Sequence, residues 1–383
     1  MQELVLKNKK KLGTSRCHPW VYSGAVAAIP EKAEYGDTLE VRSAEGALVG
    51  YGHYSKGKSI ICRIFEFTST EIKIDEAFWL KKFRKALEYR KALGFSIPSS
   101  TESYRLFYSE GDELPGLICD VYGSSASAHL MTEGMQKLQT LIVQFLKSEV
   151  GVKSLYIKTP QESYWVDKKD KEFHFEENGL KLVSLIEEGQ KTGYFLDQRD
   201  NRKLVSQFSK GKTVLDAFCY LGGFGLNALK GGAKEVCFLD ASQVALEQVQ
   251  GHVMMNFPDA KYNLEASDCF EYLRKMPADY FDLIILDPPA FVKHADYIKQ
   301  AARAYKDINM IALKKIKAGS FLFTYSCSQH MSRELFRTVV YQAALDAGRK
   351  VRVMKELCQS PDHPVNIYHP EGDYLKGLML YVS

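Results

Sequence analysis

From Gly193 onward the chain alternates short apolar runs with segments of helical length, and this rhythm constrains the fold more than any other feature. The apolar runs predict strands at residues 213–216, 235–240, 263–267, 281–287 and 320–326. Strands that alternate with helices pair in parallel, because each helix carries the chain back across one face of the sheet. The sequence therefore predicts a doubly wound α/β sheet, which two later runs at 350–357 and 376–383 complete.

Acidic residues stand where three of these predicted strands end. Asp216 ends the first strand, Asp240 ends the second, and Asp268 follows the third. Ligands of open α/β sheets bind beyond the carboxyl ends of the strands. There Asp240 could accept hydrogen bonds from two ribose hydroxyls, and Asp268 could accept one from an adenine amine. The alternative is a set of ordinary surface acids at strand-to-helix turns.

The loop after Asp216 is rich in glycine and contains Phe218, Tyr220 and Gly222. Glycine lets the backbone approach a ligand closely, and the helix that follows presents unpaired N–H groups there. The spacing is not Gly-x-Gly-x-x-Gly, which lowers the case for NAD. We count this loop, together with Ser242 after the second strand, among the candidate cofactor contacts.

The fourth strand runs into Asp287-Pro288-Pro289-Ala290-Phe291. A Pro-Pro pair rigidifies a turn and leaves carbonyl groups without competing N–H donors. Asp287 and those carbonyls could read the amine edge of a flat base, and Phe291 could stack on its face. This element resembles the target-base motif of nucleic-acid methyltransferases.

The fifth strand ends in Ser326-Cys327-Ser328 and should neighbour the fourth, which places Cys327 beside Asp287. Carbon 5 of cytosine is too weak a nucleophile to accept a methyl group unless a thiolate first adds to carbon 6. A proton or hydrogen bond from Asp287 to ring N3 would stabilise the charge that this addition creates. A buried structural cysteine is the alternative interpretation.

Two further functions stay open at this level. One is methylation of an exocyclic amine on adenine or guanine, a reaction that needs no thiol. The other is a non-catalytic RNA-binding or ribosome assembly factor that has kept the fold. Cys327 argues against the first, although Asp287-Pro288-Pro289-Ala290-Phe291 could suit it. Cys327 and the intact set of acids argue against the second, which a failure to bind the cofactor would favour.

The first part of the chain has a different pattern. Short strands separated by turns, up to about Phe67, suggest a small β-barrel. Before them lies a basic run, Lys7, Lys9, Lys10, Lys11 and Arg16, which is either a solvated face or a contact for RNA phosphates. Helical and strand patterns then mix, with helices expected at 76–93 and 136–145 and strands at 116–122 and 154–158, so we expect a separate α+β domain.

Composition limits the class of protein. The formal net charge is +4, which permits a nucleic-acid partner without requiring one. The 8 cysteines contain no Cys-x-x-Cys pair and the histidines show no ligand spacing, so we expect no metal and a reducing compartment. No apolar run reaches the roughly 20 residues of a membrane span, and no signal peptide is visible, so we expect a cytoplasmic protein.

Several long motifs, taken in order, resemble the RlmI family of bacterial 23S ribosomal RNA cytosine-C5 methyltransferases. The N-terminal His18-Pro19-Trp20-Val21-Tyr22-Ser23-Gly24 is similar to that family's opening PUA domain, a small RNA-binding barrel. The other motifs are the segment 191–202, Tyr220-Leu221-Gly222-Gly223-Phe224, Asp287-Pro288-Pro289, the segment 305–310, Ser326-Cys327-Ser328 and Tyr374-Leu375-Lys376-Gly377.

The resemblance implies a PUA-like barrel at 1–70, a central α+β domain at 71–186 and a class I, Rossmann-like methyltransferase domain at 187–383. It implies S-adenosyl-L-methionine as cofactor, 23S rRNA or a large-subunit particle as substrate, and a homodimer as a possible assembly. Cys327 and Asp287 would be catalytic. The implied cofactor contacts are Asp216, Phe218, Tyr220, Gly222, Asp240, Ser242, Asp268 and Asp287.

This chain departs from the family pattern after Pro288-Pro289, where Ala290 stands in place of a frequent lysine. Pro289 also stands where many other cytosine-C5 RNA methyltransferases have a second cysteine. Relatives within the resembled family share this proline. Its presence leaves open which group removes the carbon-5 proton and which group helps product release. Elsewhere, segment 191–202 could help to shape the cofactor pocket, and Lys376 is expected to be exposed or to contact an RNA phosphate.

Overall fold

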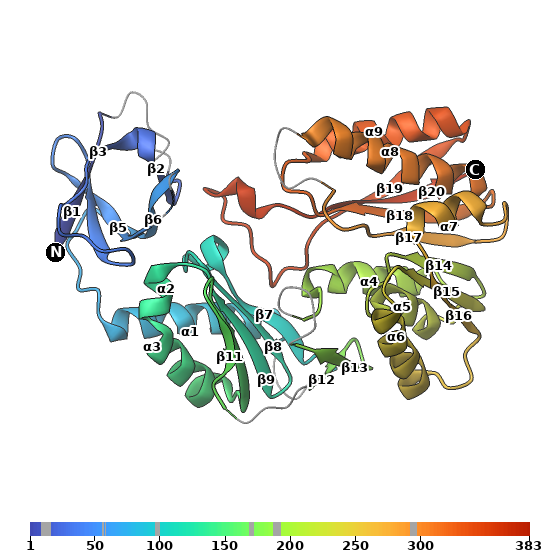
Figure 1. Cartoon of the computed structure of the whole chain (residues 1–383), viewed down its shortest axis with the longest axis horizontal. Coiled ribbons are helices and arrows are strands. Elements are labelled where there is room, and N and C mark those ends of the chain that lie inside the picture. The colour runs from blue at the N-terminus through green and yellow to red at the C-terminus, as the bar shows by residue number, and fades with distance from the viewer. Residues whose placement is uncertain are drawn as a thin grey trace. The chain divides into compact units, whose positions relative to one another are not determined.

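The computed structural model describes residues 1–8, 17–55, 57, 59–95, 100–167, 172–186, 193–291 and 297–383. Most of the basic run near the N-terminus lies outside these residues. The chain forms two compact units built from alternating segments (Figure 1). Unit 1 comprises 1–176, 184–194 and 361–372, and unit 2 comprises 177–183, 195–360 and 373–383.

A six-stranded sheet forms the first part of unit 1, and it is nearly closed into a barrel, as the sequence predicts. Its core is made of alternate side chains such as Leu4, Leu39 and Val41, all fully buried. In sheet order the strands are β2 (Trp20–Tyr22), β6 (Ile60–Phe67), β5 (Leu48–Tyr54), β4 (Thr38–Arg42), β1 (Gln2–Leu6) and β3 (Val26–Ala28).

The second part of unit 1 is an α+β layer. Helix α1 (Glu76–Ala92) begins at Asp75, whose carboxylate accepts a hydrogen bond from the Phe78 N–H at 3.0 Å. Two shorter helices are α2 (Glu133–Lys137) and α3 (Gln139–Phe145). The five strands, in sheet order, are β11 (Ser163–Trp165), β10 (Ser154–Lys158), β9 (Ser125–Leu130), β8 (Leu117–Tyr122) and β7 (Ser103–Tyr108).

The expectation of one helix over 136–145 is wrong. Thr132 caps an earlier helix start, and the chain leaves helical geometry at Leu138, with φ −91° and ψ 3°. The Leu138 N–H bonds to the Met135 carbonyl, a tight three-residue turn that ends α2 before α3 begins. A separate two-stranded hairpin follows later in the chain, formed by β12 (Glu172–Glu177) and β13 (Leu180–Leu185).

Unit 2 contains a seven-stranded sheet that confirms the predicted α/β fold. The first five strands are parallel, and the last strand pairs antiparallel with both of its neighbours. In sheet order they are β16 (Tyr262–Ala266), β15 (Glu235–Asp240), β14 (Thr213–Ala217), β17 (Leu283–Leu286), β18 (Ser320–Ser326), β20 (Lys376–Val382) and β19 (Val351–Leu357).

Helices cover both faces of this sheet (Figure 1). One set comprises α4 (Arg199–Gln207), α5 (Gly223–Lys230) and α6 (Gln243–Asn256). The other comprises α7 (Cys269–Lys275), α8 (Ile298–Lys315) and α9 (Arg333–Ala347), which share one apolar core. The central strands β14 and β17 are buried along their whole length, which is why they read as continuous apolar runs.

The strand order reverses at β14, because β15 lies on one side of it and β17 on the other. In a sheet of this kind the reversal opens a crevice at the carboxyl ends of the two central strands. This position is where the sequence predicts the site. No helix in the described part of the chain is long and apolar enough to cross a membrane.

Candidate active site

Asp216, a predicted cofactor contact, is buried at the end of β14, with 1% of its surface exposed. Its Oδ2 accepts a hydrogen bond from the Gly225 N–H at 2.8 Å, while its Oδ1 has no partner among the described atoms. Burial, reinforced by the negative charges of Asp287 and Asp240, raises its pKa to about 8. The free oxygen of a buried acid of this kind can bind a hydrogen-bond donor or a cation that a ligand supplies.

Asp240, at the end of β15, holds the glycine-rich loop in place. Its Oδ2 accepts from the Tyr220 N–H and its Oδ1 from the Ser242 N–H, both at 2.9 Å. Ser242 in turn caps α6 by accepting from the Ala245 N–H. The carboxylate is only partly buried, so its remaining lone pairs can accept further hydrogen bonds.

The loop between β14 and α5 has a sharply folded backbone. Phe218 and Tyr220 have positive φ values of 62° and 48°, although neither is glycine, and Gly222 has a φ of 76°. Such conformations cost roughly 1–3 kcal/mol each and persist where surrounding structure enforces them. The glycines here also serve packing: a Cβ on Gly225 would lie 2.2 Å from the Phe238 ring.

Asp268 lies at the same edge of the sheet, after β16, and it is exposed. It is the N-cap of α7, and its Oδ1 accepts a hydrogen bond from the Glu271 N–H at 3.0 Å. Its position fits the sequence prediction, while this contact is that of an ordinary helix cap.

Asp287 follows β17 and is fixed by two amide side chains, that of Gln198, which directly precedes α4, and that of Asn201 in the first turn of α4. The Gln198 amide nitrogen donates to Asp287 Oδ1 at 3.0 Å, and the Asn201 amide nitrogen donates to Gln198 Oε1 at 2.6 Å. Gln198 and Asn201 are 2% and 4% exposed. The sequence placed Gln198 in a motif that could shape the pocket, but no pattern in it indicated this contact with Asp287.

Phe291, the predicted stacking residue, is partly buried against neighbouring aromatic rings. Its ring centroid lies 4.7 Å from that of Tyr305 and 5.7 Å from that of Phe270. The ring therefore belongs to the apolar core of α7 and α8, with only part of its surface available.

Cys327 lies directly after β18, the strand next to β17, and its side chain is partly exposed. Its Sγ donates to the Pro288 carbonyl oxygen at 3.8 Å. The structure thus brings the thiol against the Asp287-Pro288 turn, as strand order predicts. Cys219, the rival in the cofactor loop, is buried, and that burial raises its pKa well above the usual value.

Lys376 corrects the sequence expectation of an exposed lysine or a phosphate contact. It begins β20 and is 3% exposed. Its Nζ donates to the carbonyl oxygens of Ser328 at 2.8 Å and Tyr374 at 2.7 Å. The lysine is therefore part of the buried frame around the Cys327 turn.

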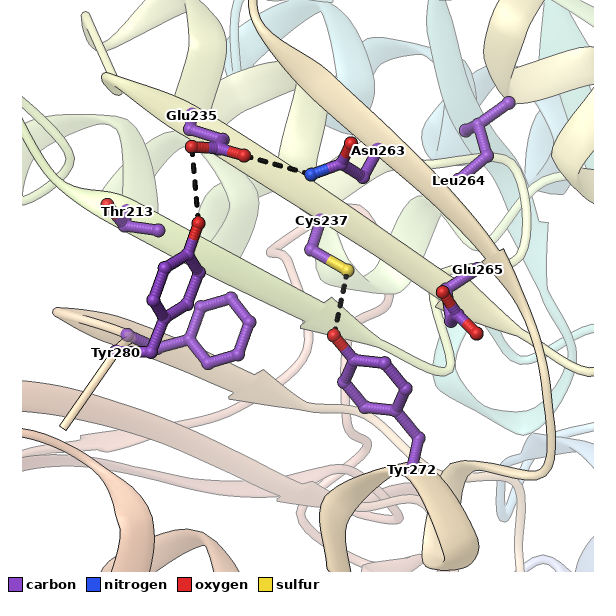
Figure 2. A pocket seen from close by; sticks show the side chains of 9 residues that line it. Thr213, Glu235, Cys237, Asn263, Leu264, Glu265, Tyr272 and Tyr280 are labelled. Carbon is purple, nitrogen blue, oxygen red and sulfur yellow. Dashed lines mark hydrogen bonds between the residues drawn. The ribbon is translucent and has the colours of Figure 1, made fainter. Parts of the chain in front are cut away.

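A separate pocket of about 230 Å³ lies toward the amino ends of β14 and β15 (Figure 2). Glu235, in its wall, accepts hydrogen bonds from Asn263 and Tyr280, and it pairs with Lys261 at 2.8 Å. Glu235, Asn263 and Tyr280 thus bind one another. It lies away from the edge of the sheet that carries Asp216, Asp287 and Cys327.

Comparisons with known proteins agree with this geometry. Residues 157–325 match a family of S-adenosylmethionine-dependent methyltransferases, and residues 4–67 match a PUA-like domain. Ribosomal RNA large subunit methyltransferase I of Alteromonas mediterranea is 38% identical over 395 aligned positions, which cover 100% of this chain and 99% of that protein.

The chain belongs to the ribosomal RNA large subunit methyltransferase I family. Solved structures show the same fold. A candidate SAM-dependent methyltransferase from Streptococcus mutans superposes with a TM-score of 0.84 at 21% identity, covering 99% of this chain and 100% of that chain. A second candidate methyltransferase, complexed with SAH, gives a TM-score of 0.86 at 21% identity and the same coverage.

Members of this family use S-adenosyl-L-methionine, and the residues of this chain suit that cofactor. The unpartnered Asp216 Oδ1 suits a cationic or N–H-bearing part of such a ligand. The Asp240 carboxylate suits vicinal hydroxyls, and the sharply turned Phe218–Gly222 loop joins these two acids. Among the described residues, no group of His, Cys, Asp and Glu is arranged to hold a metal ion.

Proposed function

We propose that this chain methylates carbon 5 of a cytosine in 23S ribosomal RNA, through a covalent bond between Cys327 and carbon 6 of the base. The observation that carries the proposal is the position of the Cys327 thiol. This thiol is partly exposed and lies 3.8 Å from the carbonyl oxygen of Pro288, which belongs to the turn that begins with Asp287. The relative at 38% identity is named as a ribosomal RNA large subunit methyltransferase, which supports the choice of RNA.

Cys327 acts as the nucleophile in this proposal. Its thiolate adds to carbon 6, and the electron pair of the 5,6 double bond becomes available at carbon 5. S-adenosyl-L-methionine, when bound, supplies an electrophilic methyl group. After methyl transfer, the proton on carbon 5 passes to a base, the double bond re-forms, and the Cys327 sulfur leaves carbon 6 with its electron pair.

Asp287 stabilises the charge that the addition places on the ring. A proton shared between its carboxyl group and ring N3 offsets the negative charge created by thiolate attack. The Gln198 amide, bonded to Asp287 Oδ1 at 3.0 Å, fixes the orientation of that carboxyl group. We further propose that Asp216, Phe218, Tyr220, Gly222, Asp240, Ser242 and Asp268 form the cofactor pocket.

The division into domains at 1–70, 71–186 and 187–383 stays a proposal as well. In it, the barrel that contains the PUA-like residues 4–67 contacts RNA. Contacts with phosphates release counterions from the RNA, and this release contributes less free energy as the salt concentration rises, so RNA affinity should fall with ionic strength.

Trapping with a modified base tests the mechanism. When RNA that carries 5-fluorocytosine at the target is mixed with enzyme and cofactor, fluorine cannot leave as a proton does, so the bond to Cys327 persists. We expect a protein–RNA adduct that survives denaturing electrophoresis. Cys327→Ala should remove both the adduct and methyl transfer, while cofactor binding measured by calorimetry stays within about twofold of wild type.

The matched control is Cys358→Ala, which removes an exposed thiol that no part of the mechanism uses and should leave adduct and activity intact. An active Cys327→Ala enzyme that forms no adduct would show methylation of an exocyclic amine instead. A folded wild-type protein that binds RNA but transfers no methyl group to rRNA would favour an assembly factor.

A further inference from the structure

Lys376 occupies an unusual place for a lysine. It is the first residue of β20 and pairs directly with Ser326, the last residue of β18, in the antiparallel register. The next residue after Ser326 is Cys327. With 3% of its surface exposed, Lys376 reaches under the turn and donates to the carbonyl oxygens of Ser328 and Tyr374. The ammonium group thus braces the segment that carries the thiol.

Among the described residues, the charge of Lys376 has no carboxylate partner. Within the described residues, no Asp or Glu forms an ion pair with its Nζ, and the nearby Asp373 is engaged by Arg333 at 2.6 Å. Carbonyl groups take two of the three ammonium hydrogens. Burying an ammonium costs free energy that an apolar side chain of the same size would avoid.

The Cys327 thiol is among the groups whose charge acts on Lys376. Burial lowers the pKa of Lys376 to about 8, with Asp373 opposing that shift, Arg333 adding to it, and Cys327 opposing it. The influence of two charges on each other is mutual. A thiolate at Cys327 therefore favours the ammonium, and the ammonium favours the thiolate.

We propose that Lys376 is a positioning residue for Cys327: it holds the Ser326–Ser328 turn through the Ser328 carbonyl, and its positive charge favours the thiolate form of the nucleophile. The proposal rests on the function proposed for Cys327 above. A thiolate, and not a thiol, adds to a pyrimidine ring, so a nearby cation raises the reactive fraction at neutral pH.

The pH dependence of alkylation tests the charge directly. Iodoacetamide modifies thiolates, and mass spectrometry of the peptide that contains Cys327 reports its rate separately from those of the other cysteines. Lys376→Gln keeps two N–H donors but removes the charge. We expect the midpoint of the rate profile to rise by about one pH unit or more, with alkylation near pH 7 roughly tenfold slower.

Two variants serve as controls for the Lys376→Gln result. Lys376→Arg retains a positive charge, so its midpoint should stay near that of wild type or below it. Lys355→Gln removes an exposed lysine from the neighbouring strand β19 and should leave the profile unchanged. A Lys376→Gln protein that melts like wild type and shows the wild-type profile would overturn the proposal.

A reciprocal measurement covers the case in which Lys376→Gln does not fold. In Cys327→Ala, which leaves Lys376 intact, the loss of the thiolate should lower the midpoint for acetylation of Lys376 by acetic anhydride. An unchanged midpoint would overturn the proposal. Neither measurement requires RNA, so a failure of the covalent mechanism would appear in the 5-fluorocytosine experiment and not in these profiles.

Discussion

The burial of Asp216 affects both the stability of the folded protein and the binding of a ligand. Its carboxyl group is buried at the end of β14, one of its oxygens has no partner among the described atoms, and its pKa is raised to about 8. Ionisation in the folded protein is therefore unfavourable until a ligand supplies compensating charge or hydrogen bonds. A raised pKa is expected for a residue that binds a ligand and that burial fixes in position before the ligand arrives.

The sign of this effect predicts the pH dependence of stability. Because the pKa in the folded state lies above that of an unfolded Asp, near 3.8, the folded protein binds more protons between about pH 4 and 8. The contribution of Asp216 to the free energy of unfolding is full below pH 4 and is lost as pH rises through 8. Asp216→Asn, which cannot ionise, should melt several degrees above wild type at pH 8.5 and near it at pH 5.

The same variant should lose affinity for the cofactor. Replacing the carboxylate by an amide removes its hydrogen bonds to charged groups, so we expect binding at pH 8 to weaken roughly tenfold or more. Calorimetry and thermal melts on one preparation give both numbers. A variant with wild-type affinity would remove Asp216 from the pocket, and one less stable than wild type at pH 8.5 would contradict the raised pKa.

Among the structural elements, β5 meets α1 and α2 through a buried histidine. The His53 ring stacks on Trp79 at 5.3 Å and contacts Phe65 at 4.7 Å. Gly134 at the start of α2 allows this approach, because a Cβ there would lie 2.2 Å from the ring. Burial, with the positive charge of Lys137, lowers the pKa of His53 to about 3.

This packing predicts sensitivity to acid in unit 1. The folded pKa of His53 lies below the 6.5 of an unfolded histidine, so its contribution to stability is full above pH 6.5 and is lost as pH falls toward 3. Between pH 7 and 4.5 wild type should lose about 2 kcal/mol more than His53→Phe, as measured by urea unfolding followed through tryptophan fluorescence. His174→Phe, at an exposed site, should behave like wild type. Parallel losses in wild type and His53→Phe would contradict the prediction.

The sequence predicted those helices and strands in which a single hydrophobic periodicity dominates. Buried parallel strands such as β14 and β17 are nearly continuous apolar runs, so their positions follow from composition. The break between α2 and α3 was missed because Leu138 is apolar and fits a helical pattern, while a tertiary arrangement sets its backbone angles. The hairpin of β12 and β13 was not predicted, although both of its strands alternate buried apolar residues with more exposed ones, as half-buried strands do.

In the candidate site, too, some positions follow from the sequence pattern and others do not. Asp287 and Cys327 were placed together because both follow strands that are neighbours in a doubly wound sheet. Lys376 was expected at the surface, since a lysine near the end of a chain is usually exposed. Its burial follows from the antiparallel pairing of β20 with β18, a contact between distant segments that local patterns do not encode.

At the scale of the whole molecule, the chain passes between its two units five times, so neither unit is one continuous segment. The short stretch 177–183 belongs to unit 2, although the residues on either side belong to unit 1. Glu177 anchors it: its carboxylate receives two hydrogen bonds from the Arg202 guanidinium of α4. Both side chains are almost fully buried.

Removing one member of this pair should therefore be costly. Glu177→Ala leaves the Arg202 charge buried without its carboxylate, and we expect a loss of about 3–5 kcal/mol in the free energy of unfolding. Urea unfolding followed by circular dichroism measures it. In the double variant Glu177→Leu, Arg202→Met, apolar side chains fill the space and most of the stability should return. A double variant as unstable as Glu177→Ala would mean that the loss has another source.

β20 lies in the interior of its sheet, between β18 and β19, yet it follows both of them in the chain. Translation delivers residues in order from the N-terminus. Strands β18 and β19 are therefore synthesised before the strand that joins them, and Lys376 reaches the Cys327 turn only with that strand. A nascent copy cannot assemble this edge of the sheet while β20 is still inside the ribosome, which delays the finished thiol site until synthesis of this region is over.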